Sequence, residues 1–251
     1  AYPFAFSDGD YSYNENANYN FETSSSTIVM PLAAPMETSI ANLKIFLSEN
    51  EGKVVNITGY YKSDENNESA YPNLGLARAN AVKNHLVTNG ISSASINTMG
   101  QLMDHMVPDN GIYLGPVSYG ISGESETAGD ELKTLYAKIQ ANPLVLYFDT
   151  AEASINLSAE QRQKVADISR YLDKVEGSTL TIVGHTDNTG VAATNIKLGL
   201  NRADFAKAYF MRNGISETKI NTSSKGQTDP VESNATEEGK SKNRRTVVTL
   251  N

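Results

Sequence analysis

The sequence predicts an α+β fold, an α/β sandwich made of two tandem β-α-β-α-β domains. The first observation behind this prediction is a repeat, because segments 74–98 and 198–222 are identical at 13 of 25 aligned positions. The second is alternation: around each segment, short apolar runs typical of strands alternate with stretches whose apolar residues recur at helical spacing. Strands that alternate with helices form a sheet onto which the helices pack. We therefore expect two copies of one structural unit.

The expected elements follow in a clear order. In the second copy, Ser158 with Gln161 three residues later is a capping box that opens a helix, and Asn213-Gly214 is typical of a helix end. The second copy is expected to contain a strand at 144–150, the capped helix, a strand at 178–187, a helix from about 194 to 212, a short strand near 219–222, a polar loop at 226–243 and a last strand at 245–250. The first copy is expected to contain a strand at 26–32, a helix carrying Ile40, Leu43 and Leu47, a strand at 53–61, a helix at 75–88 and a final strand near 114–121.

The composition narrows the classes of function. The chain has 251 residues, is 39% hydrophobic and carries a formal net charge of −8 at pH 7. Compact nucleic-acid binders are usually basic, so this charge argues against nucleic acid as a partner. The absence of cysteine excludes disulfides, thiolate metal sites and iron–sulfur clusters, and three histidines are few for a histidine-rich metal centre. We expect no cofactor and no metal.

Residues 1–24 are rich in tyrosine, asparagine and acidic residues and show no sustained period. We interpret them as an irregular arm or linker, which leaves residues 25–122 for the first domain and 123–251 for the second. The first residue is alanine, and a signal peptide or membrane anchor that preceded it would leave no trace, so an anchor outside this chain stays open. No apolar run in the sequence approaches the ~20 residues that span a bilayer.

Three motifs of the second copy carry a family resemblance. They are Gly184-His185-Thr186-Asp187 at a strand end, then Asn195, Leu198, Gly199, Arg202 and Ala203 on a helix, then Asn234-Ala235-Thr236, Gly239-Lys240 and Asn243-Arg244-Arg245. With these motifs, residues 144–250 resemble the OmpA-like peptidoglycan-binding domain found at the C-terminus of OmpA and in Pal. The family usually has serine where this chain has Gly199. Its fold is a mixed sheet with two helices on one face, which agrees with the pattern above.

The resemblance implies a site for the diaminopimelate of the peptidoglycan stem peptide. The matching residues are Asp187 and Arg202 for the acid and arginine that bind it, Asn195 for the assisting asparagine, Arg244 for the first arginine of the last motif, and Thr186 and Gly199 as supporting positions. A diaminopimelate end carries an ammonium, which a carboxylate can take, and a carboxylate, which a guanidinium can take through two parallel hydrogen bonds. Such a site binds rather than reacts, so no enzyme is expected. The resemblance also implies a Gram-negative periplasmic protein, associated with the outer membrane or cell wall, with peptidoglycan as its partner.

The first copy resembles the same family in degenerate form. It has Lys62 in place of the binding acid, Arg78 at the position of Arg202 and Tyr71 in place of the assisting asparagine, and residues 100–121 contain no Asn-Arg-Arg. Lysine would repel an ammonium, so we expect no diaminopimelate there unless an acid of the inserted loop takes over. The candidate acids are Asp64, Glu65 and Glu68. A different anionic ligand, a structural role or contact with other envelope proteins also stays open.

Plainer interpretations of the same residues stay open. Asp187 and Arg202 can simply pair with each other. His185 at a strand end is typical of a structural histidine, and no Gly-x-Ser-x-Gly motif supports a catalytic one. Arg244 and Arg245 make too thin a basic patch for nucleic acid. The alternative function is a protein-interaction or sensor module with a retuned pocket, which the glycine in the helix motif and the lost acid of the first copy keep open.

Overall fold

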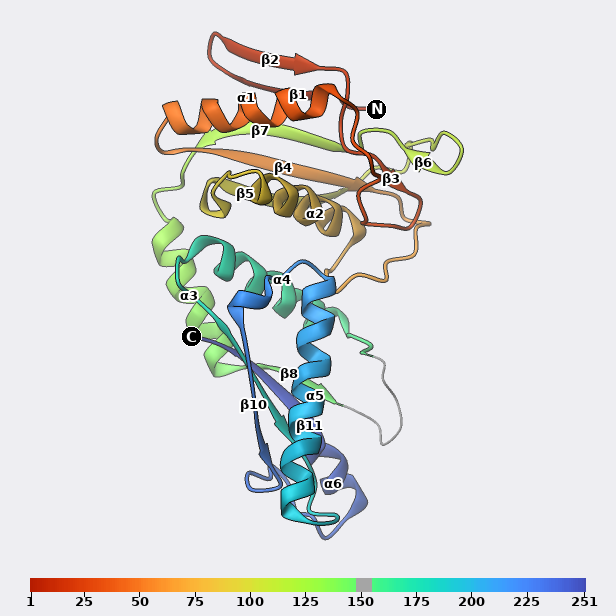
Figure 1. The fold of residues 1–251 in the computed structure, drawn as a ribbon, viewed down its shortest axis with the longest axis vertical. Coiled ribbons are helices and arrows are strands. Elements are labelled where there is room, and N and C mark those ends of the chain that lie inside the picture. The colour runs from red at the N-terminus through yellow and green to blue at the C-terminus, as the bar shows by residue number, and fades with distance from the viewer. Residues whose placement is uncertain (148–154) are drawn as a thin grey trace. The chain divides into compact units, whose positions relative to one another are not determined.

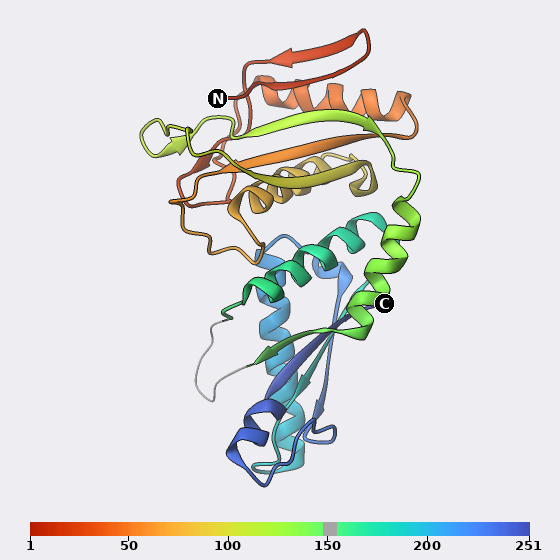
Figure 2. The same ribbon diagram turned by 180° about the vertical axis from the view of Figure 1, so that it is seen from behind.

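The computed structural model of the chain describes residues 1–147 and 155–251. It divides into two compact units, Ala1–Ala128 and Gly129–Asn251, each with its own sheet and core (Figures 1 and 2). The first unit contains β1 (Phe4–Asp8), β2 (Tyr11–Glu15), β3 (Phe21–Glu22), α1 (Pro35–Glu49), β4 (Lys53–Tyr61), α2 (Leu74–Thr88), η1 (Ser93–Ser95), β5 (Ile96–Leu102), β6 (Ile112–Tyr113) and β7 (Val117–Gly123). From the boundary onward the chain forms α3 (Ala128–Ala141), β8 (Leu144–Tyr147), α4 (Ala159–Lys174), β9 (Leu180–His185), α5 (Ala192–Arg212), η2 (Glu217–Lys219), β10 (Ile220–Gly226), α6 (Glu237–Asn243) and β11 (Arg245–Leu250).

The sheet of the second unit is mixed, in the order β10-β9-β11-β8. β9 and β10 run parallel, and β11 runs antiparallel to both β9 and β8. The helices bury their apolar faces, with Val165 and Ile168 of α4 and Phe210 of α5 fully enclosed. Ser158 and Gln161 form the expected capping box at the start of α4. The predicted α+β class, with helices packed on a mixed sheet, is confirmed.

The three-stranded sheet of the first unit repeats part of this topology. Its order is β5-β4-β7, with β4 parallel to β5 and antiparallel to β7, as β9 is to β10 and β11. α2 packs beside β4 and β5 in Figure 1, as α5 packs beside β9 and β10. The strand and helix expected at 53–61 and 75–88 are β4 and α2, with a helix start one residue earlier.

The interpretation of residues 1–24 as an irregular arm is wrong. β1 and β2 form an antiparallel hairpin, and β3 pairs with β6. Phe4, Phe6, Tyr19 and Phe21 lie in the core of the first unit. Each aromatic side chain can remove roughly 150–250 Å² from water, so these four residues make the segment part of the unit. Each strand of the hairpin is only five residues long, too short for its alternation to register as a sustained period.

Four other expectations need correction or restriction. In the described first unit, residues 26–32 form no strand; Ile28 makes only an isolated bridge to Phe21. The segment expected as a loop at 226–243 ends in a helix, α6, because Thr236 caps the backbone N–H of Gly239 at 3.1 Å. β10 is longer than the expected 219–222 and runs to Gly226. The strand expected at 144–150 is present as β8 up to Tyr147, and its last three residues lie outside the described residues.

Among the described helices, none combines the length and the apolar character needed to cross a membrane.

Candidate functional site

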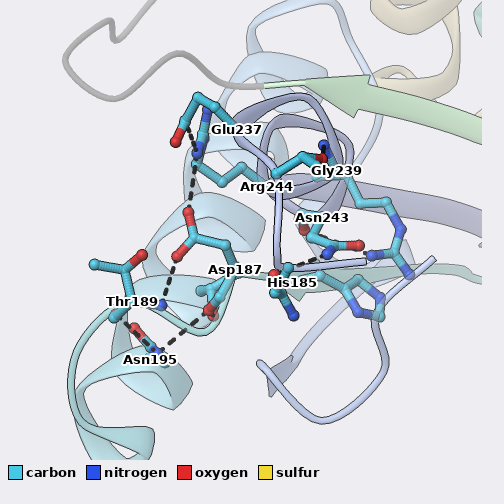
Figure 3. Close-up of polar contacts among 12 residues, drawn as sticks. His185, Asp187, Thr189, Asn195, Glu237, Gly239, Asn243 and Arg244 are labelled. Carbon is cyan, nitrogen blue, oxygen red and sulfur yellow. Dashed lines mark hydrogen bonds and ion pairs between the residues drawn. The ribbon is translucent and has the colours of Figure 1, made fainter. Parts of the chain in front are cut away.

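The carboxylate of Asp187 lies just beyond β9 at the centre of the predicted site (Figure 3). Its Oδ1 accepts the backbone N–H of Thr189 at 2.8 Å, and its Oδ2 pairs with Nη1 of Arg244 at 2.9 Å. Burial by itself raises the pKa of Asp187, but the bonds from Thr189 and Arg244 outweigh burial and hold that pKa below its usual value of 3.8. Asp187 is therefore a fixed negative charge at neutral pH.

Arg244 is the ion-pair partner of Asp187. It follows α6 directly, and its Nη1 also contacts Oε1 of Glu237 at 3.0 Å. The hydrogen bond to Asp187 is the main cause that raises the pKa of Arg244. The Nε of Arg244 is buried without a hydrogen-bond partner among the residues that the structure describes. The expectation that Asp187 pairs with Arg202 is therefore wrong, because α6 brings a second arginine to the same carboxylate.

Arg202 lies on α5, three residues after Gly199. Its Nη1 donates to the carbonyl of His185 at 3.1 Å. Within residues 1–147 and 155–251, no carboxylate forms an ion pair with it. Burial lowers the pKa of Arg202, the charge of Arg244 adds to that effect, and Asp187 opposes it. An arginine stays charged in proteins, so Arg202 is a partly buried cation whose one hydrogen bond among the described residues goes to the His185 carbonyl.

Asn195 and Thr186 hold the turn that follows β9. The Nδ2 of Asn195 lies 3.3 Å from the Asp187 carbonyl and 3.2 Å from the Thr189 carbonyl, and 2.6 Å from Oε1 of Gln227. The hydroxyl of Thr186 donates to the Asp187 carbonyl at 2.8 Å. Both side chains are buried. The structure thus brings Asn195 and Thr186 to the site as residues that shape the Asp187 turn.

His185 is buried in this unit, and its ring lies apart from the Asp187 carboxylate in Figure 3. Burial is the main cause that lowers its pKa to about 4, with the charge of Arg245 second. Its Nδ1 is buried with no hydrogen-bond partner in the described part of the chain. The imidazole is therefore neutral at neutral pH and forms no His–Asp pair with Asp187.

Asn243 is a site residue whose role the sequence did not reveal. It is fully buried, and its Oδ1 accepts the backbone N–H groups of Val231 at 2.8 Å and Glu232 at 3.1 Å. Its Nδ2 donates to the Glu232 carbonyl at 2.8 Å and to Oδ1 of Asn234 at 2.9 Å. Asn243 therefore ties the 231–234 turn to the end of α6, directly before Arg244. The sequence signal that could have pointed to this role was the position of Asn243 as the first residue of the Asn243-Arg244-Arg245 motif.

The matching position of the first unit is already filled. Arg78 is fully buried and pairs with Glu65 of the inserted loop, with Nη2 to Oε1 at 2.5 Å and Nη1 to Oε2 at 3.1 Å. Lys62, at the position of Asp187, pairs with the exposed Asp64 at 3.2 Å. Tyr71 is buried. Of the three acids proposed as replacements, Glu65 is the one that reaches Arg78, and it neutralises this arginine.

Comparisons with known proteins agree with this organisation. The model of the OmpA family matches residues 20–110 and 147–244. The chain is 35% identical over 104 residues to Outer membrane protein A of Bordetella avium, which covers 41% of this chain and 53% of that protein. It is 38% identical over 87 residues to Peptidoglycan-binding protein ArfA of Mycobacterium tuberculosis, covering 34% of this chain and 27% of that protein. The match thus spans about half or less of these relatives.

Among solved structures, the chain is similar to the peptidoglycan-associated lipoprotein from Burkholderia pseudomallei. The two share 23% sequence identity with a TM-score of 0.38, over 43% of this chain and 89% of that one.

Proposed function

Because the chain belongs to the OmpA family, we propose that its second unit binds peptidoglycan non-covalently through the diaminopimelate of the stem peptide. The protein would thereby be anchored to the cell wall, in the periplasm and near the outer membrane. The observation that carries this proposal is the unequal pairing of the two arginines. Arg244 contacts Asp187 through one nitrogen, Nη1, at 2.9 Å, while Arg202 holds only a backbone carbonyl among the described residues.

The charges of the site suit a ligand that carries both an ammonium and a carboxylate. Asp187 keeps its negative charge well below neutral pH and can accept an ammonium. The guanidinium of Arg202 can donate two parallel hydrogen bonds to a carboxylate, which the ammonium of a lysine cannot do. A diaminopimelate end offers both groups on one carbon, so one ligand would satisfy both residues.

The first unit supports the role given to Arg202. Arg78 donates Nη1 to the carbonyl of Tyr60 at 2.8 Å, just as Arg202 donates Nη1 to the carbonyl of His185 at 3.1 Å. Tyr60 and His185 each follow the aligned strand glycine. With this same anchor, Arg78 holds a carboxylate by two further N–H groups. A ligand carboxylate at Arg202 would repeat an arrangement that the chain already uses.

A binding role fits this site better than a catalytic one. His185 is neutral and buried, and Asp187 contacts Arg244 rather than an imidazole. The glycine at 199 has a packing cause: a Cβ there would lie 2.9 Å from the backbone carbonyl oxygen of Gly184 and would also overlap Oγ of Ser224. The glycine is therefore no longer a reason to prefer a protein-interaction module, and only the missing acid of the first copy still speaks for that alternative. For the first unit we propose that diaminopimelate does not bind, since Glu65 occupies its arginine.

Co-sedimentation with purified peptidoglycan sacculi tests this function. Asp187→Asn removes one charge at nearly constant size, and Arg202→Gln removes one charge and keeps a shorter polar side chain. Truncating one partner of a buried charged contact typically weakens binding by about 2–5 kcal/mol. Each variant should therefore remain in the supernatant at protein concentrations where the wild type is fully bound.

Asp130→Ala and Arg170→Ala are the matched controls, because they remove the same charges from exposed positions of the same unit. Both should pellet like the wild type. If Asp187→Asn and Arg202→Gln pellet as well as these controls, the wall contact lies elsewhere on the protein.

A further inference from the structure

We propose that the first unit contains a complete carboxylate-binding site that its own Glu65 occupies as an internal ligand. The site consists of the Arg78 guanidinium and the backbone N–H groups of Ser24 and Lys62. Contacts within the first unit support this proposal; only the comparison with Arg202 rests on the function proposed above.

The carboxylate of Glu65 is held at every acceptor position that it has. Oε1 accepts Nη2 of Arg78 at 2.5 Å and the backbone N–H of Ser24 at 2.9 Å. Oε2 accepts Nη1 of Arg78 at 3.1 Å and the backbone N–H of Lys62 at 2.8 Å. A carboxylate has about four lone-pair sites, and all are used here. The side chains of Arg78 and Glu65 are only 0% and 3% exposed.

The arginine is held in place independently of Glu65. Its other three N–H groups donate to backbone carbonyls: Nε to Ser25 at 3.0 Å, Nη1 to Tyr60 at 2.8 Å and Nη2 to Glu22 at 3.3 Å. The rings of Phe21 and Tyr113 lie 5.7 and 5.3 Å from its guanidinium carbon. Removing the Glu65 side chain would therefore leave an ordered cation and two aimed backbone donors around an empty volume.

The polypeptide keeps this internal ligand in position. Ser24 has the positive φ of 56° that non-glycine residues seldom adopt, and this conformation turns its N–H to Glu65. Its hydroxyl in turn accepts the backbone N–H of Asn66 at 3.0 Å. Ser63 donates its N–H and hydroxyl to Asp104 at 2.8 and 2.7 Å. A tethered carboxylate has a high effective concentration, so Glu65 should exclude external carboxylates from the wild-type site.

The two units are thus closed and open versions of one site. Arg78 and Arg202 share the anchor to the residue after the strand glycine. Within the described residues, a carboxylate completes the site only at Arg78. The wild-type chain would then offer a single open carboxylate site, on its second unit.

Chemical rescue of a Glu65→Ala variant by formate tests this inference. The full chain is used in an Arg202→Gln background, so that the second unit contributes no response and the two proposals can fail separately. Buried, unpaired Arg78 should destabilise the first unit, and formate should restore its stability. With formate at ~10 times its dissociation constant, the folding equilibrium shifts by ~11-fold, which raises the midpoint of the first unit's thermal transition by about 5 °C.

Three comparisons make the result specific. Sodium chloride at equal ionic strength should not restore the variant. Glu65→Gln fills the same volume without charge and should not respond to formate, and neither should Asp64→Ala, whose side chain is 71% exposed. If Glu65→Ala is unfolded without additive, refolding in formate but not in chloride would support the inference equally well. The inference would be overturned if formate did not restore the stability of Glu65→Ala. It would also be overturned if formate stabilised the Arg202→Gln parent, which retains Glu65, to the same extent.

Discussion

Gly184 and Gly199 face each other where α5 crosses β9. A Cβ on Gly184 would overlap the carbonyl oxygen of Gly199, and a Cβ on Gly199 would lie 2.9 Å from the carbonyl oxygen of Gly184 and overlap Oγ of Ser224. Gly59 and Gly75 make the same approach in the first unit. The absence of both side chains lets helix and strand backbones touch. Arg202, one turn further along α5, thereby reaches the carbonyl at the end of β9.

The first prediction concerns this close approach. Gly184→Ala should lower the free energy of unfolding of the second unit by roughly 3 kcal/mol, because its methyl group meets backbone that cannot move aside. Gly199→Ala should lower it by less, since the Ser224 hydroxyl can rotate away. Denaturant unfolding measures both. Gly129→Ala on α3, where the added Cβ has no described atom within 4 Å apart from its chain neighbours and the nearby backbone of its own helix, should be neutral or stabilising. Equal stability of Gly184→Ala and wild type would contradict the packing argument.

The second prediction concerns Asn243. Asn243→Ala leaves the backbone groups of Val231 and Glu232 without their partners. The second unit should lose roughly 1–3 kcal/mol of stability, and binding to sacculi should weaken because Arg244 follows directly. Asn234→Ala removes only one of the four hydrogen bonds and should have a smaller effect on both. If the two variants behave alike, Asn243 does not organise this turn.

The third prediction concerns His185 and pH. Its pKa is about 4 in the folded unit, against an ordinary value of 6.5, so the unfolded chain binds the proton first as pH falls. The corresponding stability is complete above about pH 6.5 and is lost between pH 6.5 and 4, about 3 kcal/mol in total. Urea unfolding of wild type and His185→Gln at pH 7 and pH 4.5 measures it. The drop in stability should be smaller in the variant; an equal drop would assign it to other groups.

Much of the fold could be predicted from the sequence because local signals agreed with tertiary packing. The Ser158–Gln161 capping box, the helix end at Asn213 and the strand at 53–61 appear as expected. The strands within residues 1–24 were not predicted because their stability comes from aromatic side chains that pack against core residues far away in the sequence. Local alternation over five residues could not reveal that burial.

The candidate site could be predicted only in part. Asp187 and Arg202 were assigned to the site because their motifs resemble those of the family. The pairing of Asp187 with Arg244 depends on α6, which lies in a segment whose polar composition predicts a loop. Likewise, Glu65 lies 13 residues from Arg78 along the chain, and only the folded loop shows that it reaches the guanidinium.

The fourth prediction concerns the ion pair that the sequence missed. Arg244→Gln removes a hydrogen bond that lowers the pKa of Asp187, so that pKa should rise. Carbon-detected NMR titration of the Asp187 carboxyl measures the change. Glu237→Gln removes the other carboxylate that contacts Arg244 and should leave the pKa of Asp187 low. An unchanged pKa in Arg244→Gln would show that this pair does not set the charge of the site.

Calorimetric titration of diaminopimelate tests the central claim most directly. The wild type should bind with measurable heat, and Asp187→Ala and Arg202→Ala should each lose on the order of 2–5 kcal/mol of binding free energy, enough to abolish the signal. Asp130→Ala, which removes an exposed carboxylate of the same unit, should bind like the wild type. Absence of heat from the wild type with both diaminopimelate and soluble muropeptides would contradict the proposed function, as would full binding by either site variant.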